Sequence, residues 1–172
     1  MNKKQIVLRI IFYSFSLAIN IFIFVQSCLN GSQSTDQSSW VVDFLASILN
    51  FFNKSAVTEE NYAEFAGAIR KLIGHFGLFF ASGFFTTVST YLIIKEYKWY
   101  SLRWVLVISL AFGASLALLT EGIQLMIPQR SGEFRDSLID FSGYLVTSVG
   151  VFLFFLFKQR KHITCEDEEK PE

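Results

Sequence analysis

The stretch that decides the fold is TEGIQLMIPQRSGEFRDSLIDFSG, residues 120–143. It gathers charged and amide side chains into a short turn between two strongly apolar segments. These residues are Glu121, Gln124, Arg130, Arg135, Asp136 and Asp140. A charge inside hydrocarbon must be compensated by a partner, a ligand or a water-filled cavity, so ionisable residues in such a place indicate a functional site.

Working outward, the composition is that of an integral membrane protein. The chain has 172 residues, of which 52% are hydrophobic, with 20 Phe and only 2 Pro. Four apolar runs reach the roughly 20 residues needed to cross a bilayer: residues 6–29, 72–94, 104–127 and 137–157. We therefore predict an all-α bundle of four transmembrane helices forming one domain, residues 1–160. The charged segment 161–172 is predicted to be a disordered cytoplasmic tail.

The distribution of Lys and Arg predicts the orientation. Ten basic residues lie on the side that holds both termini and five lie on the other, so the positive-inside rule places both termini in the cytoplasm. The net charge is zero, and the basic link at residues 95–103 carries three aromatic residues, which favours an interfacial anchor. We expect no nucleic-acid partner.

The first apolar run has an alternative interpretation. Lys3 and Lys4 precede it and Cys28 follows it, as in a lipoprotein signal peptide. The length of the run and the polar Gln26 favour a transmembrane helix instead. Cys28 and Cys165 then lie on opposite sides of the membrane, so we expect no disulfide.

The region between the first two spans is predicted to lie outside the membrane. Residues 30–39 are polar and Ser-rich, which predicts a loop, and residues 40–54 have the period of a short amphipathic helix. A second short helix is predicted from about Glu59, leading into the second span. Whether this region covers the bundle or docks elsewhere stays open.

Polar residues recur at helical spacing on the first two spans. Ser16, Asn20 and Ser27 share one face of the first, and His75 begins a stripe with Ser82 and Thr86 on the second. Such faces are expected to point into the bundle rather than toward lipid.

The predicted topology brings the polar ends of several helices to one level. His75, Glu121, Gln124 and Asp140 fall near the outer ends of their spans, with Glu121 about 9 Å inside if the third span ends at Ile127. Just above them lie five further charged residues: Arg70, Lys71, Arg130, Arg135 and Asp136. We predict that these nine residues form an outward-facing pocket.

Several chemistries fit such a pocket. Arginine and lysine suit an anionic headgroup, particularly a phosphate or diphosphate, and buried Glu121 and Asp140 suit acid–base catalysis. His75, Glu121 and Asp140 are acceptable metal ligands, but the nearby arginines oppose a cation, so no metal and no cofactor is predicted. A serine nucleophile, Ser27 or Ser131, is a weaker alternative. A purely structural network of salt bridges also stays open.

Three blocks of this sequence resemble sequence patterns of the VanZ-like membrane proteins. The strongest is the opening stretch, with Glu121, Gln124, Pro128, Arg130, Asp136, Asp140 and Gly143 in the family's pattern. IRKLIGHF is similar to the family's Arg-Lys-x-x-x-His block and supplies Arg70, Lys71 and His75. FVQSCLNGSQS is a weaker match, because Cys28 and Leu29 stand where the family often has Ser and Gln.

The resemblance implies a bacterial plasma-membrane protein with a relative that lowers susceptibility to teicoplanin and other lipophilic glycopeptide antibiotics. Our first hypothesis is that the pocket engages an anionic lipid or a lipid-linked cell-envelope precursor. The second is an enzyme that modifies such a lipid, with Glu121 or Asp140 as general acid or base. The third is a structural partner of another membrane protein. The oligomeric state is left open.

Overall fold

The computed structural model describes residues 3–97, 100–128, 130 and 132–168, with side chains as far as residue 160. Every secondary-structure element in that part of the chain is a helix, which confirms the all-α class. The elements are α1 (Lys3–Ser27), α2 (Gly31–Phe52), α3 (Tyr62–Ile69), a π-helix η1 (Arg70–Gly77), α4 (Leu78–Ile94), α5 (Leu102–Gln124) and α6 (Phe134–Glu168).

Four helical segments are long and apolar enough to cross a membrane, as predicted. They are Lys3–Ser27, Tyr62–Ile94, Leu102–Gln124 and Phe134–Arg160. The second is a continuous rod of α3, η1 and α4 that begins ten residues before the predicted start at 72. The helix α6 continues to Glu168, and residues 169–172 lie outside the described residues, so disorder of the tail stays a prediction.

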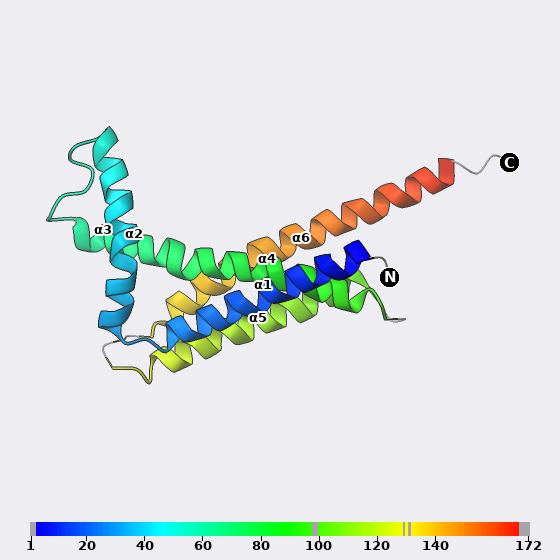
Figure 1. The fold of residues 1–172 in the computed structure, drawn as a ribbon, viewed down its shortest axis with the longest axis horizontal. Helices are drawn as coiled ribbons and strands as arrows, with labels where there is room; N and C mark the ends of the chain where they lie inside the picture. Colours follow the sequence, from blue (N-terminus) through cyan, green and yellow to red (C-terminus); the bar gives the residue numbers. More distant parts are fainter. Residues whose placement is uncertain (1–2, 98–99, 129, 131, 169–172) are drawn as a thin grey trace.

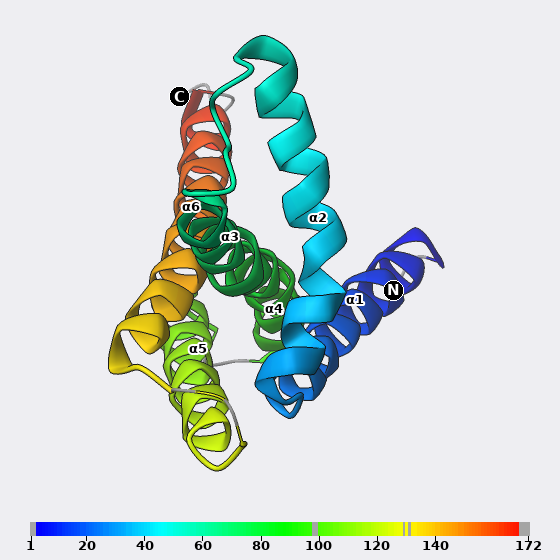
Figure 2. The same ribbon diagram turned by 90° about the vertical axis from the view of Figure 1, so that its left-hand side faces the viewer.

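The four long segments run side by side, and α2 lies across one end of them (Figure 1). The described chain begins and ends at the opposite end of the bundle, as an even number of spans requires. Viewed from the α2 end, α4 lies among α1, α5 and α6, and it contacts all three (Figure 2). Only Ile23 and Ser27 of α1 are buried, so α1 is the most peripheral span.

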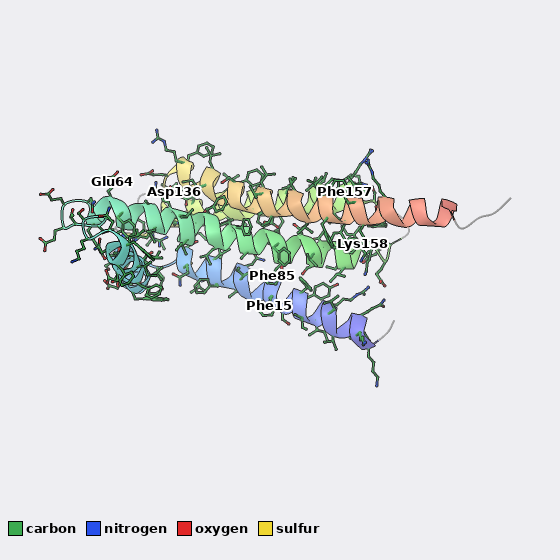
Figure 3. The ribbon with its side chains drawn as sticks, turned by 90° about the horizontal axis from the view of Figure 1, so that it is seen from above. Phe15, Glu64, Phe85, Asp136, Phe157 and Lys158 are labelled. Carbon is green, nitrogen blue, oxygen red and sulfur yellow. The ribbon has the colours of Figure 1, made fainter. Side chains whose placement is uncertain are left out.

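Aromatic and charged side chains divide the bundle into levels that suit a bilayer. Phe15 and Phe85 stack in the middle, with ring centroids 5.2 Å apart, whereas Glu64 and Asp136 lie toward one end and Lys158 toward the other (Figure 3). Many of the exposed side chains are large and apolar, such as Phe22 and Leu118. Such residues suit contact with lipid tails.

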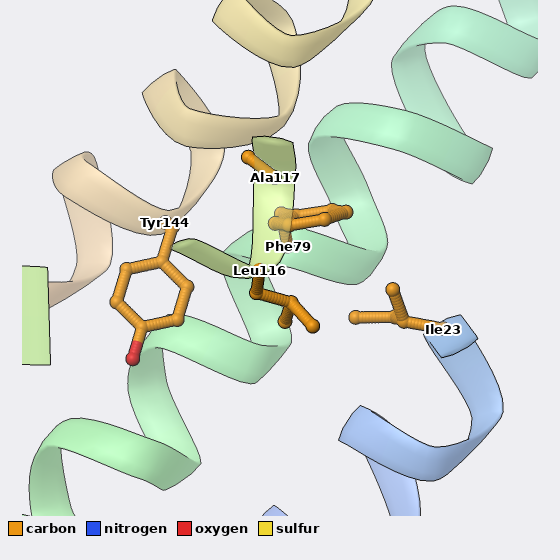
Figure 4. Packing of buried hydrophobic residues seen from close by; sticks show 5 residues of the cluster. All are labelled: Ile23, Phe79, Leu116, Ala117 and Tyr144. Carbon is orange, nitrogen blue, oxygen red and sulfur yellow. The ribbon is translucent and has the colours of Figure 1, made fainter. Parts of the chain in front are cut away.

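The core at the α2 end is small and tightly packed. Ile23, Phe79, Leu116, Ala117 and Tyr144 form one buried cluster from all four spans (Figure 4). A Cβ at Gly113 would collide with the ring of Tyr144. Small residues therefore let the helices approach closely, which replaces the hydrophobic driving force that is missing within lipid.

The polar face of α1 points into the bundle as predicted. Asn20 Nδ2 donates to Thr86 Oγ1 at 3.1 Å, and Ser82 Oγ donates to Asn20 Oδ1 at 2.8 Å. Ser16 Oγ lies 3.0 Å from the same Thr86 hydroxyl. This network joins α1 to α4 near the middle of the membrane-spanning region.

The predicted loop at residues 30–39 is wrong, because α2 is one helix of 22 residues that begins at Gly31. Asn30 caps it: the Asn30 side chain accepts from the Gln33 backbone N–H at 2.9 Å, and the Gln33 side chain accepts from the Asn30 N–H at 3.3 Å. Ser38 and Ser39 donate to carbonyls of the preceding turn. These bonds satisfy the polar run within a helix.

Candidate functional site

The π-helix η1 positions the residues of the second block. In an α-helix, side chains five residues apart point about 140° away from each other. The wider i→i+5 winding of a π-helix brings such a pair closer together, and Arg70 and His75 both line one cavity. Lys71 instead faces α6. Short π segments occur frequently at functional sites.

His75 joins η1 to α6 at the centre of the site. Its Nδ1 lies 3.0 Å from Oδ1 of Asp140, whose exposed fraction is 1%. One turn further along α6, a Cβ at Gly143 would overlap the carbonyl oxygen of Phe76. The glycine thus allows α6 to lie directly on η1, which keeps Asp140 within reach of His75.

A second ion pair also joins η1 to α6. Lys71 Nζ is 2.9 Å from Oδ1 of Asp136 and 3.7 Å from Oε2 of Glu133. The Asp136 side chain is largely buried, while those of Lys71 and Glu133 are about half exposed. The structure therefore brings together two predicted site residues, Lys71 and Asp136. Glu133 joins them, although it is not among the residues predicted from the sequence.

Glu121 is the buried carboxylate of α5, with an exposed fraction of 5%. Its Oε2 accepts a hydrogen bond from the Glu133 backbone N–H at 3.1 Å, whereas its Oε1 is buried without a hydrogen-bond partner. Ligand atoms of Glu121, His75 and Asp140 all lie within 4.8 Å of one another. Three helices therefore deliver one acid–imidazole–acid cluster.

A cavity of about 520 Å³ opens beside this cluster. Its polar lining includes Arg70, His75, Gln124, Arg130 and Asp140. Ser38 of α2 also lines it and accepts a hydrogen bond from Arg70 Nε at 3.0 Å. Part of α2, which connects the first two long helices, thus lines the cavity. The sequence alone leaves open whether this region covers the bundle or docks elsewhere.

Arg130 comes from the turn between α5 and α6. Partial burial lowers the pKa of its guanidinium, while the negative charge of Glu121 raises it. The Arg130 guanidinium nevertheless stays protonated at neutral pH, because the ordinary pKa of arginine lies far above that pH. Arg130 therefore supplies a permanent positive charge to the cavity.

Five of the nine predicted pocket residues line the cavity, whereas Lys71, Glu121, Arg135 and Asp136 do not. Arg135 is exposed on the first turn of α6 and does not line the cavity. Ser27 lines the cavity, but its hydroxyl donates to the carbonyl of Ile23 at 2.9 Å while His75 is engaged by Asp140. Ser131, the other candidate nucleophile, lies outside the described residues.

The residues of α2 that line the cavity are not among the site residues predicted from the sequence. Ser34, Gln37, Ser38 and Trp40 line the cavity, but a loop was predicted for most of them. The signal that would have found this helix is the capping box, Asn30 followed three residues later by Gln33. Glu133 had no such signal, because its position depends on how the turn folds back over α5.

Four apolar helices and a charged cavity at one end of the bundle define a multi-pass membrane protein with a polar site. The chain belongs to the VanZ/LLP1 family, whose sequence model matches residues 10–159. This result confirms the predicted family. No curated protein and no solved structure matched the chain.

Proposed function

We propose that the protein binds the anionic head of a membrane lipid or of a lipid-linked cell-envelope precursor in this cavity. The observation that carries the proposal is that two arginines from distant parts of the sequence, Arg70 and Arg130, line the same cavity. A guanidinium can donate two parallel hydrogen bonds to a phosphate, so two of them suit a phosphate or diphosphate group.

The apolar wall of the cavity supports a lipid rather than a free anion. Phe22, Ile73, Leu78 and Phe79 line the same cavity as the charged residues. Phe22 and Ile73 are also 48% and 43% exposed, so this wall is continuous with the outer apolar surface of the bundle. An acyl or polyprenyl chain would lie along it while the head reaches the arginines. The volume falls within the usual range for ligand pockets, about 300–1,000 Å³.

The predicted orientation puts this cavity at the outer face of a bacterial plasma membrane, with both termini in the cytoplasm. Lower susceptibility to teicoplanin would then be one consequence of occupying or altering such a lipid.

The test uses Arg130→Gln with Arg135→Gln as its matched control. Each variant removes one arginine charge, and the two positions are only a few residues apart in the sequence. Of the two, only Arg130 lines the cavity. Purified protein in phosphatidylcholine nanodiscs would be titrated with a labelled polyprenyl diphosphate and with phosphatidylglycerol. We expect Arg130→Gln to weaken binding about tenfold or more, and Arg135→Gln to leave it unchanged. Wild-type affinity in both Arg130→Gln and Arg70→Gln would contradict the proposal.

A second candidate function is favoured by the cluster of His75, Glu121 and Asp140. An imidazole held by one carboxylate, beside another carboxylate with an unpartnered oxygen, provides groups for proton transfer. Incubation of the protein with the labelled lipid separates the two functions. A product that depends on Glu121 supports an enzyme, and retention of unchanged lipid supports binding alone.

A further inference from the structure

We propose that His75, Glu121 and Asp140 bind one divalent transition-metal ion, with zinc as the best candidate. The proposal does not depend on the lipid, because it rests on the three side chains alone. From the sequence, a metal is not expected at these residues because arginines are near. The structure supplies a reason to reverse that expectation.

The first reason is geometric. Zinc binds imidazole nitrogen and carboxylate oxygen at about 2.0–2.2 Å, so neighbouring ligand atoms in a tetrahedral site lie about 3.4 Å apart. The ligand atoms of the cluster lie within 4.8 Å of one another, and one pair, in His75 and Asp140, is 3.0 Å apart. Closing the largest separation from 4.8 Å to about 3.4 Å would move the ligand atoms about 1.4 Å closer together, which rotation about side-chain torsions can supply.

The second reason is the unpartnered oxygen of Glu121. A buried carboxylate oxygen without a hydrogen-bond donor is costly, so its retention calls for an explanation. The backbone N–H of Glu133 occupies Oε2 and leaves Oε1 available. An ion beside His75 and Asp140 would supply the missing partner.

The third reason is that, among the described residues, no lysine or arginine forms an ion pair with Glu121 or Asp140. Lys71 is held by Asp136 and Glu133, and Arg70 donates to Ser38 of α2. Among the ion pairs of the described residues, none joins Arg130 to Glu121. With a neutral His75, Glu121 and Asp140 carry two negative charges, which a divalent ion would neutralise.

The three ligands also leave room for a fourth. His75 and Asp140 line the cavity, so an ion between them and Glu121 would have one side toward the cavity. Three protein ligands with an open position are typical of sites where zinc contacts water or substrate, and closed structural sites have four. One imidazole and two carboxylates suit zinc and manganese better than copper(I), which prefers sulfur.

The test measures metal bound to purified full-length protein in detergent without added lipid, so its result does not depend on the lipid proposal. Protein stripped with a chelator would be incubated with Zn²⁺, dialysed and analysed for metal content. We expect about one Zn²⁺ per chain, and visible absorption bands of tetrahedral Co²⁺ when that ion is substituted.

Glu121→Gln and His75→Ala should each lower zinc affinity at least tenfold, whereas Glu133→Gln should retain it. Glu133→Gln is the matched control, because its exposed carboxylate is adjacent but lies outside the cluster, and its backbone bond to Glu121 is kept. Size-exclusion profiles identify any variant that fails to fold, and Asp140→Asn then replaces it. Less than one-tenth of a metal ion per chain, or equal zinc binding in all variants, would overturn the proposal.

Discussion

The two ends of the helix bundle are stabilised in different ways. At the α2 end, charged side chains from η1, α5, α6 and their connections are buried against one another around a cavity. At the opposite end, aromatic packing dominates: the rings of Tyr91 and Phe155 stack with centroids 3.8 Å apart. The ion pair there, between Arg9 and Glu96, involves a Glu96 side chain that is 54% exposed.

The difference supports the proposal that a ligand binds at the α2 end. Burying a charge costs several kcal/mol unless it is well paired, and an apolar substitute of similar shape often stabilises a protein as well or better. The aromatic end shows that this bundle can be packed without buried carboxylates. The charges at the α2 end are therefore better explained by a ligand than by stability.

The largest effect is expected from Gly143, which allows the charged end to assemble. Gly143→Ala would force a Cβ into the carbonyl of Phe76, and backbone overlap of this kind costs about 1–3 kcal/mol or more. The melting temperature in detergent should fall by several degrees or more, and lipid binding should be lost.

Gly150→Ala is the control for Gly143→Ala, because it lies on the same helix toward the aromatic end and its new Cβ would meet no atom within 4 Å. It should be neutral or slightly stabilising, since alanine favours helix. Equal melting temperatures for the two variants would mean that close contact between α6 and η1 does not distinguish the ends.

A smaller effect is expected at the ion pair between Lys71 and Asp136, which does not line the cavity. Lys71→Ala leaves the largely buried Asp136 without its cation, but Lys71 is about half exposed, so solvent screens part of the loss. We expect destabilisation of about 1 kcal/mol, seen in equilibrium unfolding. Lys54→Ala removes an exposed lysine from the link between α2 and α3 and should have no effect. Equal stability of the two variants would show that this ion pair adds nothing measurable to the stability of the fold.

The sequence predicts the membrane spans and their topology better than it predicts the local conformation of individual helices. The four spans follow from apolar length, and the approach of His75 to Asp140 follows from topology, since both lie near the same ends of their spans. Topology says nothing of helix winding, so the sequence does not predict the π-helix that carries Arg70 and His75, both of which line the cavity. A Ser-rich run is typical of a loop, and composition does not reveal that its hydroxyls will hydrogen-bond to backbone carbonyls of their own helix. For this reason the sequence predicts a loop over the first part of α2.

The smallest effect is expected at the opposite end, where Arg9 and Glu96 pair. The Arg9 guanidinium holds the pKa of Glu96 below its ordinary value of 4.5. A carboxyl group with a lowered pKa in the folded state adds stability above pH 4.5, and that stability is lost as the pH falls through the lowered pKa. Glu96→Gln should therefore melt slightly below the wild type at pH 7, and the two should converge in acid. Added salt should narrow the gap because the Glu96 side chain is 54% exposed, although that of Arg9 is only 15% exposed. A gap that persists in acid and in high salt would mean that Glu96 acts through packing, and that both ends of the bundle rely on specific side-chain fit.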